Sequence, residues 1–500
     1  RRQRQMCIRD SKNIVELVEK KSAGIYAQDS DTTNAVTAGS PVKKATIDIT
    51  KEESAGIYSI LTKEANGDKK ILNAKLGTDK AKIVVGTAST SSAGIYGKLT
   101  KDVNTVSNPS LQNKVLTLQN DGDIEVGSKG SVGIYGQNET YKSTDIADNL
   151  LINNSGLIKV SAEGSVGINA NRRVKVTNSG TGIANVTAVT NTTNGILLTA
   201  KSTAGIIGKN GSEIINDGDI NLASATQPSG ATEGLVGISI DDLSNDDKLS
   251  AEYTSTGFKN STVTNNGTIT VNTDYSTGIS GKAGRITNNT KILLNNTNSV
   301  GIASTDGSVI NSAGTNNLIE VKESNSVGIF AKLTENAPFP FQAILNKGTI
   351  TLNGGNTKTS SVGIYSLIED KAVQANKTQT ILNTGEINVG TKGSAGIYIK
   401  DNRTTGTNLV SLVGNEKDIN VTEESSAGII GEYSQITNGN PLNTNGKIKL
   451  SAKKTAGIIA NKKSVVINHG TIETSATVTV SNNTEGLVGI SADNSTVTNK

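Results

Sequence analysis

The sequence predicts an all-β protein, a parallel β-helix of about 15 coils with three short strands in each coil. Three observations lead to this prediction: a phrase containing Gly-Ile that recurs 15 times, a second phrase built on Asn-x-Gly, and the short length of the smallest repeat. A fixed period of a few tens of residues is typical of solenoids and propellers, in which each repeat is one supersecondary unit.

The first phrase reads Ser-Ala/Val-Gly-Ile-Tyr. Looser copies keep the Gly-Ile pair, and the mean spacing between neighbouring copies is about 33 residues. The complete copies are Ser22–Tyr26, Ser54–Tyr58, Ser92–Tyr96, Ser131–Tyr135, Ser361–Tyr365 and Ser394–Tyr398. The glycines in register are Gly24, Gly56, Gly94, Gly133, Gly167, Gly205, Gly237, Gly278, Gly301, Gly328, Gly363, Gly396, Gly428, Gly457 and Gly489.

The second phrase reads apolar-apolar-Asn-x-Gly-x-Ile-x-apolar, as in Ile381–Val389. One repeat therefore holds three short runs of alternating apolar residues, and period-2 alternation is typical of strands. The shortest repeat, from Gly278 to Gly301, has 23 residues, which suffices for three strands and three tight turns but not for a four-stranded propeller blade. No six-residue register is visible, so a left-handed hexapeptide helix is less favoured.

The composition fits a narrow solenoid. Hydrophobic residues make up 34% and aromatic residues 3%, which in an ordinary globular chain would hint at disorder, yet the apolar residues fall in register. We expect the interior to hold the Ala/Val and Ile of the first strand and the Ile and Val of the third. No run of 18 apolar residues occurs, so no membrane-spanning helix is expected.

Residues 1–11 do not fit the repeat, and we treat them as a leader that is a candidate non-native segment. Residues 12–500 are expected to be a β-helix segment cut at both ends, whose uncapped terminal coils fray or associate end to end. Four Arg and one Asp in the first ten residues account for three of the four net positive charges. The repeat region is thus nearly neutral, which argues against nucleic acid as a partner.

Equivalent residues of stacked coils should form columns. An Asn column is expected to form a structural ladder of hydrogen-bonded amides. In the third strand, Glu125 and Lys159 are expected to be neighbours, as are Lys449 and Glu473. The Asn column includes Asn154, Asn216, Asn265, Asn346, Asn383 and Asn468.

An aromatic column is the candidate ligand-binding strip. Because the Ile of each Gly-Ile pair should face inward, the residue after it should face outward. One interpretation is a structural stack that loops cover; the other is an exposed strip that binds glycan or protein. The candidate residues are Tyr26, Tyr58, Tyr96, Tyr135, Phe330, Tyr365 and Tyr398.

Insertions recur at few places in the repeat, and loops gathered at one corner of a solenoid build a separate surface. They lie at Asn104–Lys114, Leu367–Thr378, Asp241–Asn260, Ala223–Glu233 and Val478–Glu485.

The sequence offers no constellation for catalysis, so we expect no catalytic residues, no cofactor and no metal site. The one histidine, His469, is placed in a turn, and no Ser-His-Asp set or Cys/His cluster can be assembled. Polysaccharide-cleaving β-helices use clustered carboxylates. Asp123, Asp219 and Glu386 share a column position, but they do not lie in neighbouring coils. In the coil after that of Asp123, the same position is occupied by Leu157, which weakens the case for an enzyme.

The repeat, best seen at Asp121–Gly136 and Thr384–Tyr398, resembles the passenger repeats of large type V autotransporters, most of all the very large fusobacterial outer-membrane adhesins. The resemblance implies a right-handed β-helix passenger, secretion through a C-terminal barrel that this sequence does not contain, and a location at the cell surface. It also implies binding to glycans or proteins of host cells or other bacteria. Two alternatives stay open: a polysaccharide-cleaving lyase or hydrolase, and a purely structural stalk.

Overall fold

The computed structural model describes residues 14–38, 43–62, 64–100, 114–139, 149–181, 194–224, 226–242, 260–337, 341–374, 377–402, 411–442, 445–475, 478, 480 and 485–500. Contacts within the chain group it into two units. Unit 1 comprises Arg1–Pro228 and Thr232–Val263, and unit 2 comprises Ser229–Ala231 and Thr264–Lys500.

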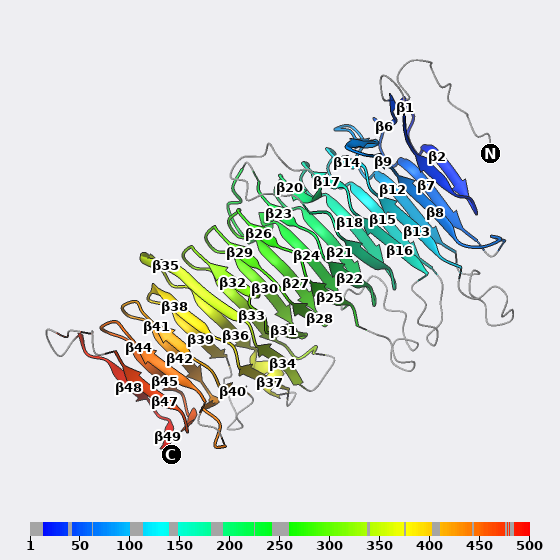
Figure 1. Ribbon diagram of the computed structural model, residues 1–500. Coiled ribbons are helices and arrows are strands. Elements are labelled where there is room, and N and C mark those ends of the chain that lie inside the picture. Colours follow the sequence, from blue (N-terminus) through cyan, green and yellow to red (C-terminus); the bar gives the residue numbers. More distant parts are fainter. Residues whose placement is uncertain are drawn as a thin grey trace. The chain divides into compact units, whose positions relative to one another are not determined.

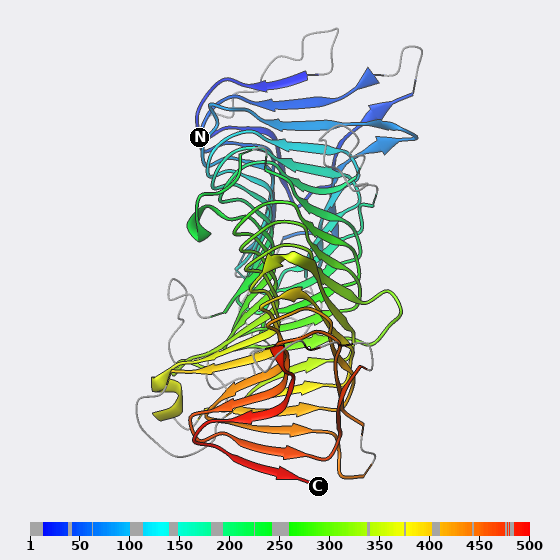
Figure 2. The same cartoon turned by 90° about the vertical axis from the view of Figure 1, so that its left-hand side faces the viewer.

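The protein is a parallel β-helix of about 15 coils, as predicted. Strands that follow one another in the chain go in turn to three sheets, which we call A, B and C, and each sheet has 15 strands. Figures 1 and 2 show, within each unit, strands of the same sheet lying side by side in successive coils. From the repeats we predict no helix longer than two turns past residue 20. In the described residues beyond that point the helical segments are η3 (Ala231–Glu233) and α2 (Asp370–Gln374), both shorter than this limit, which confirms the prediction there.

Sheet A contains the third strand of each predicted repeat, the one after the Asn-x-Gly turn. Its strands are, in order, β1 (Ile14–Leu17), β6 (Thr46–Ile49), β11 (Lys82–Val85), β14 (Asp123–Val126), β17 (Leu157–Val160), β20 (Gly195–Leu198), β23 (Ile220–Leu222), β26 (Ile269–Val271), β29 (Ile292–Leu294), β32 (Leu318–Val321), β35 (Thr349–Thr359), β38 (Ile387–Lys392), β41 (Ile419–Val421), β44 (Lys447–Leu450) and β47 (Thr471–Thr474).

Sheet B contains the Gly-Ile strands. Its strands are β2 (Ala23–Gln28), β7 (Ala55–Leu61), β12 (Ala93–Leu99), β15 (Val132–Asn138), β18 (Val166–Asn171), β21 (Ala204–Lys209), β24 (Val236–Asp241), β27 (Thr277–Lys282), β30 (Val300–Thr305), β33 (Val327–Leu333), β36 (Val362–Ile368), β39 (Ala395–Asp401), β42 (Ala427–Glu432), β45 (Ala456–Asn461) and β48 (Val488–Ala492).

Sheet C contains the strands that end at Asn. Its strands are β3 (Thr32–Asn34), β8 (Lys69–Asn73), β13 (Leu116–Asn120), β16 (Leu150–Asn154), β19 (Lys175–Asn178), β22 (Glu213–Asn216), β25 (Thr262–Asn265), β28 (Arg285–Asn288), β31 (Ser308–Asn311), β34 (Phe341–Asn346), β37 (Thr378–Asn383), β40 (Ser411–Asn415), β43 (Ser434–Asn438), β46 (Val465–Asn468) and β49 (Thr496–Asn499). Two small antiparallel pairs, β4 (Val36–Thr37) with β5 (Lys43–Lys44) and β9 (Lys75–Leu76) with β10 (Asp79–Lys80), lie outside the three sheets.

The core lies inside the coils and is built mainly from aliphatic side chains of all three sheets. Ile83 of sheet A, Ile95 of sheet B and Ile71 of sheet C have no exposed surface. Burying such a side chain contributes about 1.5–3 kcal/mol, and each coil repeats the contribution.

The Ala/Val position of the Gly-Ile phrase is buried at Ala55, Ala93, Ala395 and Ala427, which are at most 8% exposed, and half-buried at Val132 and Val362. Its side chain nevertheless turns toward the outer face of the sheet, contrary to our prediction. An ideal Cβ built on Gly94 would lie 2.6 Å from the carbonyl oxygen of Gly133 in the next coil and 3.2 Å from Cγ2 of Ile124, so Gly94 itself faces inward. The register of β12 and β15 pairs the residues on either side of this glycine but not the glycine. Gly94 and Ile95 are thus both inward, which turns Ala93 to the outer face.

The predicted Asn ladder is present, and its asparagines are buried except for Asn499 in the last coil. In unit 1 it runs from Asn34 through Asn73, Asn120, Asn154 and Asn178 to Asn216, with Nδ2-to-Oδ1 distances of 2.7–2.8 Å. In unit 2 it runs through Asn265, Asn288, Asn311, Asn346, Asn383, Asn415, Asn438, Asn468 and Asn499, with distances of 2.6–2.9 Å. The Nδ2 group of each Asn donates to the Oδ1 atom of the Asn in the next coil, so the ladder fixes which asparagines stack on one another.

A second ladder, which we did not predict, uses the Ser of the Ser-Ala/Val-Gly-Ile-Tyr phrase. The Ser54 backbone N–H donates to Ser92 Oγ at 3.0 Å, and the Ser92 N–H donates to Ser131 Oγ at 3.1 Å. The same contact joins Ser361 to Ser394 in unit 2. These serines are buried, so the hydroxyl satisfies a backbone donor that water does not reach.

The charged neighbours of sheet A occupy the predicted register but form ion pairs with other partners. Glu125 is opposite Lys159, and Lys449 is opposite Glu473. The ion pairs are Lys82 with Glu125 at 2.9 Å and Lys447 with Glu473 at 2.6 Å, which are diagonal across the strands. All four charges are partly exposed, so solvent screens each pair and its contribution to stability is small.

We predict that Gly94→Ala destabilises unit 1 by about 1–3 kcal/mol or more, because its Cβ has no space beneath the Gly133 carbonyl oxygen. Gly489→Ala is the matched control: it lies in the same phrase, and a Cβ there meets no atom within 4 Å. Urea unfolding with hydrogen exchange measures both variants. Equal stability of the two would show that the close approach of the glycines does not limit the fold.

Candidate functional site

The aromatic column lies on the outer face of sheet B. In unit 1 the register aligns Tyr26, Tyr58, Tyr96 and Tyr135, and in unit 2 it aligns Phe330, Tyr365 and Tyr398. Tyr26 is 46% exposed, and the other six are half-buried. The column therefore faces outward as predicted, and its side chains keep part of their surface in contact with solvent.

The aromatic rings stack on one another along each unit. The centroids of Tyr26 and Tyr58 are 5.7 Å apart, and those of Tyr58 and Tyr96 are 4.8 Å apart, with planes within 8° of parallel. Tyr96 and Tyr135 are tilted by 44° at 5.1 Å. In unit 2 the successive centroid distances are 5.5 and 5.3 Å. Within each stack a ring thus turns a face toward its neighbouring ring, while the end rings, such as Tyr26, have a ring neighbour on one side only.

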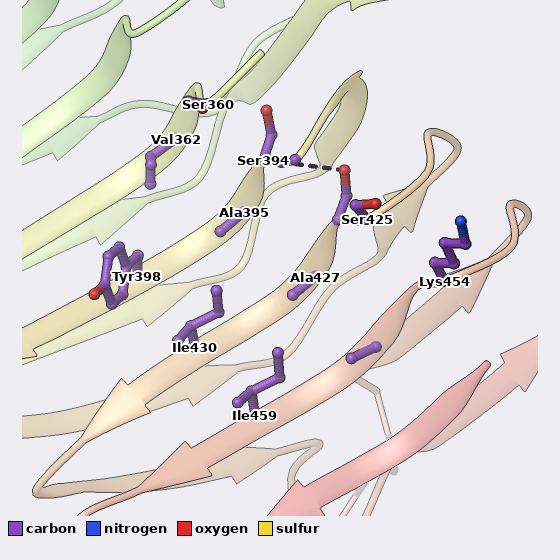
Figure 3. Close-up of a pocket in the computed structure, with 13 residues that line it drawn as sticks. Ser360, Val362, Ser394, Ala395, Tyr398, Ser425, Ala427, Ile430, Lys454 and Ile459 are labelled. Atoms are coloured by element: carbon purple, nitrogen blue, oxygen red, sulfur yellow. Dashed lines mark hydrogen bonds between the residues drawn. The ribbon is translucent and has the colours of Figure 1, made fainter. Parts of the chain in front are cut away.

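The Ala/Val column lies beside the rings at the floor of a trough, where the alanines from Ala55 on are buried and Val132 and Val362 are half-buried. In unit 1 a groove of about 620 Å³ is lined by Ala23, Ala55 and Ala93 together with the rings of Tyr26, Tyr58 and Tyr96. In unit 2 a groove of about 290 Å³ is lined by Val362, Ala395, Ala427 and Ala456 beside Tyr398. Figure 3 shows Val362, Ala395 and Ala427 projecting from the same side of the sheet as Tyr398.

Two isoleucines extend the large-residue column of unit 2, and the aromatic pattern alone missed them. Ile430 and Ile459 follow Tyr398 in register and line the same groove (Figure 3). The sequence does identify this position, because Ile430 and Ile459 each follow a Gly-Ile pair, as the ridge tyrosines do. In unit 1 the column ends differently, because Asn169 follows Tyr135.

We call the large outward column the ridge and the Ala/Val column the trough; together they form the sheet B strip. The ridge comprises Tyr26, Tyr58, Tyr96 and Tyr135 in unit 1, and Phe330, Tyr365, Tyr398, Ile430 and Ile459 in unit 2. The trough comprises Ala23, Ala55, Ala93 and Val132 in unit 1, and Val327, Val362, Ala395, Ala427 and Ala456 in unit 2.

Polar groups border the strip of unit 1. The Tyr96 hydroxyl donates to Gln137 Oε1 at 2.9 Å, and the Tyr26 hydroxyl donates to Gln28 Oε1 at 3.1 Å. Lys21 and Glu53, which line the groove, form an exposed ion pair at 3.2 Å. An apolar centre with a polar rim is typical of protein interaction surfaces.

Burial of the phenols raises their pKa. Desolvation is the main cause for Tyr58 and Tyr96 in unit 1 and for Tyr365 and Tyr398 in unit 2. A phenol is already uncharged at neutral pH, and burial keeps these four hydroxyls protonated to higher pH than in an unfolded chain.

The carboxylates that we considered for an enzyme occupy separate places. Leu157 is the register neighbour of Asp123, as predicted, and Asp123 forms an ion pair with Lys80 at 2.9 Å. His469 lies in its Asn-His-Gly turn, where its backbone N–H donates to the Asn438 carbonyl oxygen at 2.8 Å. Over the described ranges, no three His, Cys, Asp or Glu side chains gather in a way that could hold a metal ion.

The predicted corner loops can be followed only in part. Most of Asn104–Lys114 and Asp241–Asn260, and the middle of Val478–Glu485, lie outside the described residues. Ala223–Glu233 ends in η3, and Leu367–Thr378 contains α2, whose Ala372 packs against Leu333, Ala337 and Ile368. The leader, residues 1–11, also lies outside the described residues.

The chain matches no family model, no curated protein sequence and no solved structure. Among the helical segments that the structure describes, none has the length and apolar character needed to cross a membrane.

We predict that the strip tyrosines ionise late and that alkali destabilises the fold. A phenol ionises near pH 10 in an unfolded chain. Because the folded pKa of Tyr58 and Tyr96 is raised, stability is complete below about pH 10 and is lost as pH rises toward the folded pKa. Absorbance at 295 nm as a function of pH should show that some of the ten tyrosines ionise at higher pH than the rest. Urea unfolding at each pH measures the accompanying loss of stability.

The control variant is Tyr58→Phe/Tyr96→Phe, which keeps the rings and removes two of the late hydroxyls. It should lose less stability above pH 10 than the parent chain. Ionisation of all tyrosines near pH 10 while the chain stays folded would contradict the predicted burial of these phenols.

Proposed function

We propose that this chain is a passenger segment of a cell-surface adhesin, a non-enzymatic scaffold whose sheet B strip binds proteins on the surface of host cells or other bacteria. The observation that carries the proposal is the strip itself, an outward ridge of stacked rings beside an apolar trough in each unit. The resemblance of the repeats to large type V autotransporter passengers supports the same proposal.

The geometry of the rings favours protein over glycan as the partner. Aromatic side chains bind sugars through open ring faces, whereas here the faces between Tyr26, Tyr58 and Tyr96 are covered by the next ring, with centroids 4.8–5.7 Å apart. The open parts are ring edges, hydroxyls and the half-buried Val132, since Ala55 and Ala93 are at most 8% exposed. Tyr is among the residues that contribute most to the affinity of protein interfaces.

An adhesin and a purely structural stalk differ in the outer face of the coils. A stalk needs the buried ladders and the core, but its outer face can be polar throughout. Here Ala, Val, Tyr and Ile recur outward at the same positions in neighbouring coils. The apolar side chains of the ridge keep part of their surface exposed in neighbouring coils, which supports binding to a partner.

We predict that Tyr58→Ala/Tyr96→Ala weakens binding of the purified chain to target cells at least tenfold, because each truncated Tyr at the centre of an interface costs about 1–2 kcal/mol. Beads coated with the chain, incubated with epithelial cells and with bacterial cells in separate assays, measure the binding. Circular dichroism confirms that the variant keeps its β structure.

The matched control is Leu72→Ala/Leu151→Ala, which truncates two half-buried outward side chains of sheet C in the same unit. It should leave binding unchanged. If the sheet B variant binds as the parent does, the strip is not the adhesive surface. If the parent chain binds none of the cells, the proposal fails as a whole.

A further inference from the structure

Asn66 and Gly67 lie in the loop between β7 and β8 of unit 1, and hydrogen bonds anchor this loop on both sides of the pair. Before the pair, the Ala65 carbonyl oxygen accepts a hydrogen bond from the Lys114 ammonium group. After it, the Asp68 carboxylate accepts one from a backbone N–H of the next coil at 2.8 Å. Ala65 is buried, whereas Asn66 is exposed. The pair is thus an exposed turn between two anchored residues.

The backbone N–H of Gly67 has no hydrogen-bond partner in the part of the chain that the structure describes. A Cβ built at Gly67 would meet no atom within 4 Å, so the space around this residue is open. Glycine also permits backbone torsions that other residues avoid. The Gly67 nitrogen can therefore turn toward the Asn66 side chain without breaking a hydrogen bond.

The Asn66 side chain is polarised for attack at its Cγ atom. Its carbonyl oxygen Oδ1 accepts a hydrogen bond from the Lys69 ammonium group at 2.7 Å. A cation bonded to this oxygen withdraws electrons from Cγ and stabilises the oxyanion that forms when a nucleophile adds there. The same loop thus holds an electrophile, an activating cation and a free N–H.

We propose that Asn66 is a self-modification site, at which the chain converts this asparagine into aspartate or isoaspartate with water as the only co-reactant. The Gly67 nitrogen bonds to Asn66 Cγ and loses its proton, the Cγ–Nδ2 bond breaks, and Nδ2 leaves as ammonia with that proton. Water then adds to one of the two carbonyl groups of the resulting succinimide ring and opens the ring. No oxidant or reductant takes part.

The products differ from the parent chain in charge and in main-chain length. Either product places a carboxylate at position 66, beside the Lys69 ammonium group that held the amide oxygen. Isoaspartate also adds one methylene to the main chain between the anchors at Ala65 and Asp68. This modification does not depend on the proposed binding function of the sheet B strip.

The Asn353-Gly354 pair of unit 2 provides a matched comparison, because Asn353 is also exposed. Here the Gly354 N–H donates to Thr391 Oγ1 at 2.9 Å, so the nucleophile is already engaged. The Asn353 amide nitrogen donates to Glu320 Oε1 at 3.2 Å, which places an anion rather than a cation on the side-chain amide. We therefore expect Asn353 to react slowly in the folded chain.

Two further Asn-Gly pairs are protected by burial as well. Asn210 and Asn438 are buried. The glycine N–H that follows each of them is also bonded, to Ser261 Oγ at 3.0 Å and to the Asn415 carbonyl oxygen at 2.7 Å. These pairs share the dipeptide with Asn66, so any difference in rate between them and Asn66 comes from the fold.

Peptide mapping by mass spectrometry tests the proposal on the full chain, incubated at neutral pH either folded or unfolded in urea. In the folded chain we expect Asn66 to deamidate at least tenfold faster than Asn353, because only Asn66 has a free N–H and a polarised carbonyl. In urea the two rates should become similar. A folded-chain rate at Asn66 no higher than that at Asn353 overturns the proposal.

Lys69→Gln and Lys69→Arg test the activating cation, with circular dichroism to confirm that both variants keep their β structure. Lys69→Gln should lower the rate at Asn66 several-fold in the folded chain and leave the rate in urea unchanged, whereas Lys69→Arg should retain most of the folded-chain rate. Equal folded-chain rates for Lys69→Gln and the parent overturn the role of Lys69. The comparison of Asn66 with Asn353 in the parent chain is independent of whether these variants fold.

Discussion

The close approach of glycine to a carbonyl oxygen is the constraint on which the rest of this structure depends. At Gly94 the space that a Cβ would need is occupied by the Gly133 carbonyl oxygen, 2.6 Å away. Gly133 stands in the same relation to Gly167. Because Gly94 and Ile95 both face inward, the alternation of the strand shifts by one residue, and Ala93 lies outside beside Tyr96. The glycine column thus sets the close stacking of the coils, and it also creates the trough of the sheet B strip.

Buried hydrogen-bond ladders give each coil its register. The Asn120 amide donates to Asn154 at 2.7 Å and accepts from Asn73 at 2.8 Å, and all three are fully buried. The Ser ladder does the same for backbone N–H groups at the start of sheet B, as between Ser92 and Ser131. A shift by one residue would leave these groups unpaired, which costs about 1–3 kcal/mol for each group. Hydrophobic burial alone would tolerate such a shift better, because neighbouring coils present similar aliphatic side chains.

The fold was predictable from the sequence because each element repeats. Period-2 alternation and a repeat as short as Gly278 to Gly301 identify three strands per coil, and the Asn column could be foreseen from the tolerance of Asn for turns and for amide stacking. The direction of the Ala93 side chain was predicted wrongly, because strict alternation cannot place two consecutive residues, Gly94 and Ile95, on the inner face. Glycine permits this arrangement because it has no Cβ. The Ser ladder was missed because a Ser before an apolar strand has no distinctive pattern.

The candidate site was predictable in part, again because its residues recur at one position of the repeat. The outward position of Tyr26 and its equivalents follows from the inward Ile, but the ring-on-ring stacking that covers their faces depends on side-chain torsions that no pattern specifies. Ile430 and Ile459 were overlooked because the sequence was searched for aromatic residues rather than for one structural position.

Hydroxyl-radical footprinting of the chain bound to target cells tests the central claim most directly, because it reports the exposure of each outward side chain in one experiment. If the sheet B strip is the binding surface, oxidation of the ridge residues, such as Tyr58, Tyr96 and Tyr398, should fall several-fold on binding. Oxidation of outward residues of sheet C, such as Leu72 and Leu382, should stay unchanged. Protection of the sheet C residues with the ridge still reactive would contradict the account.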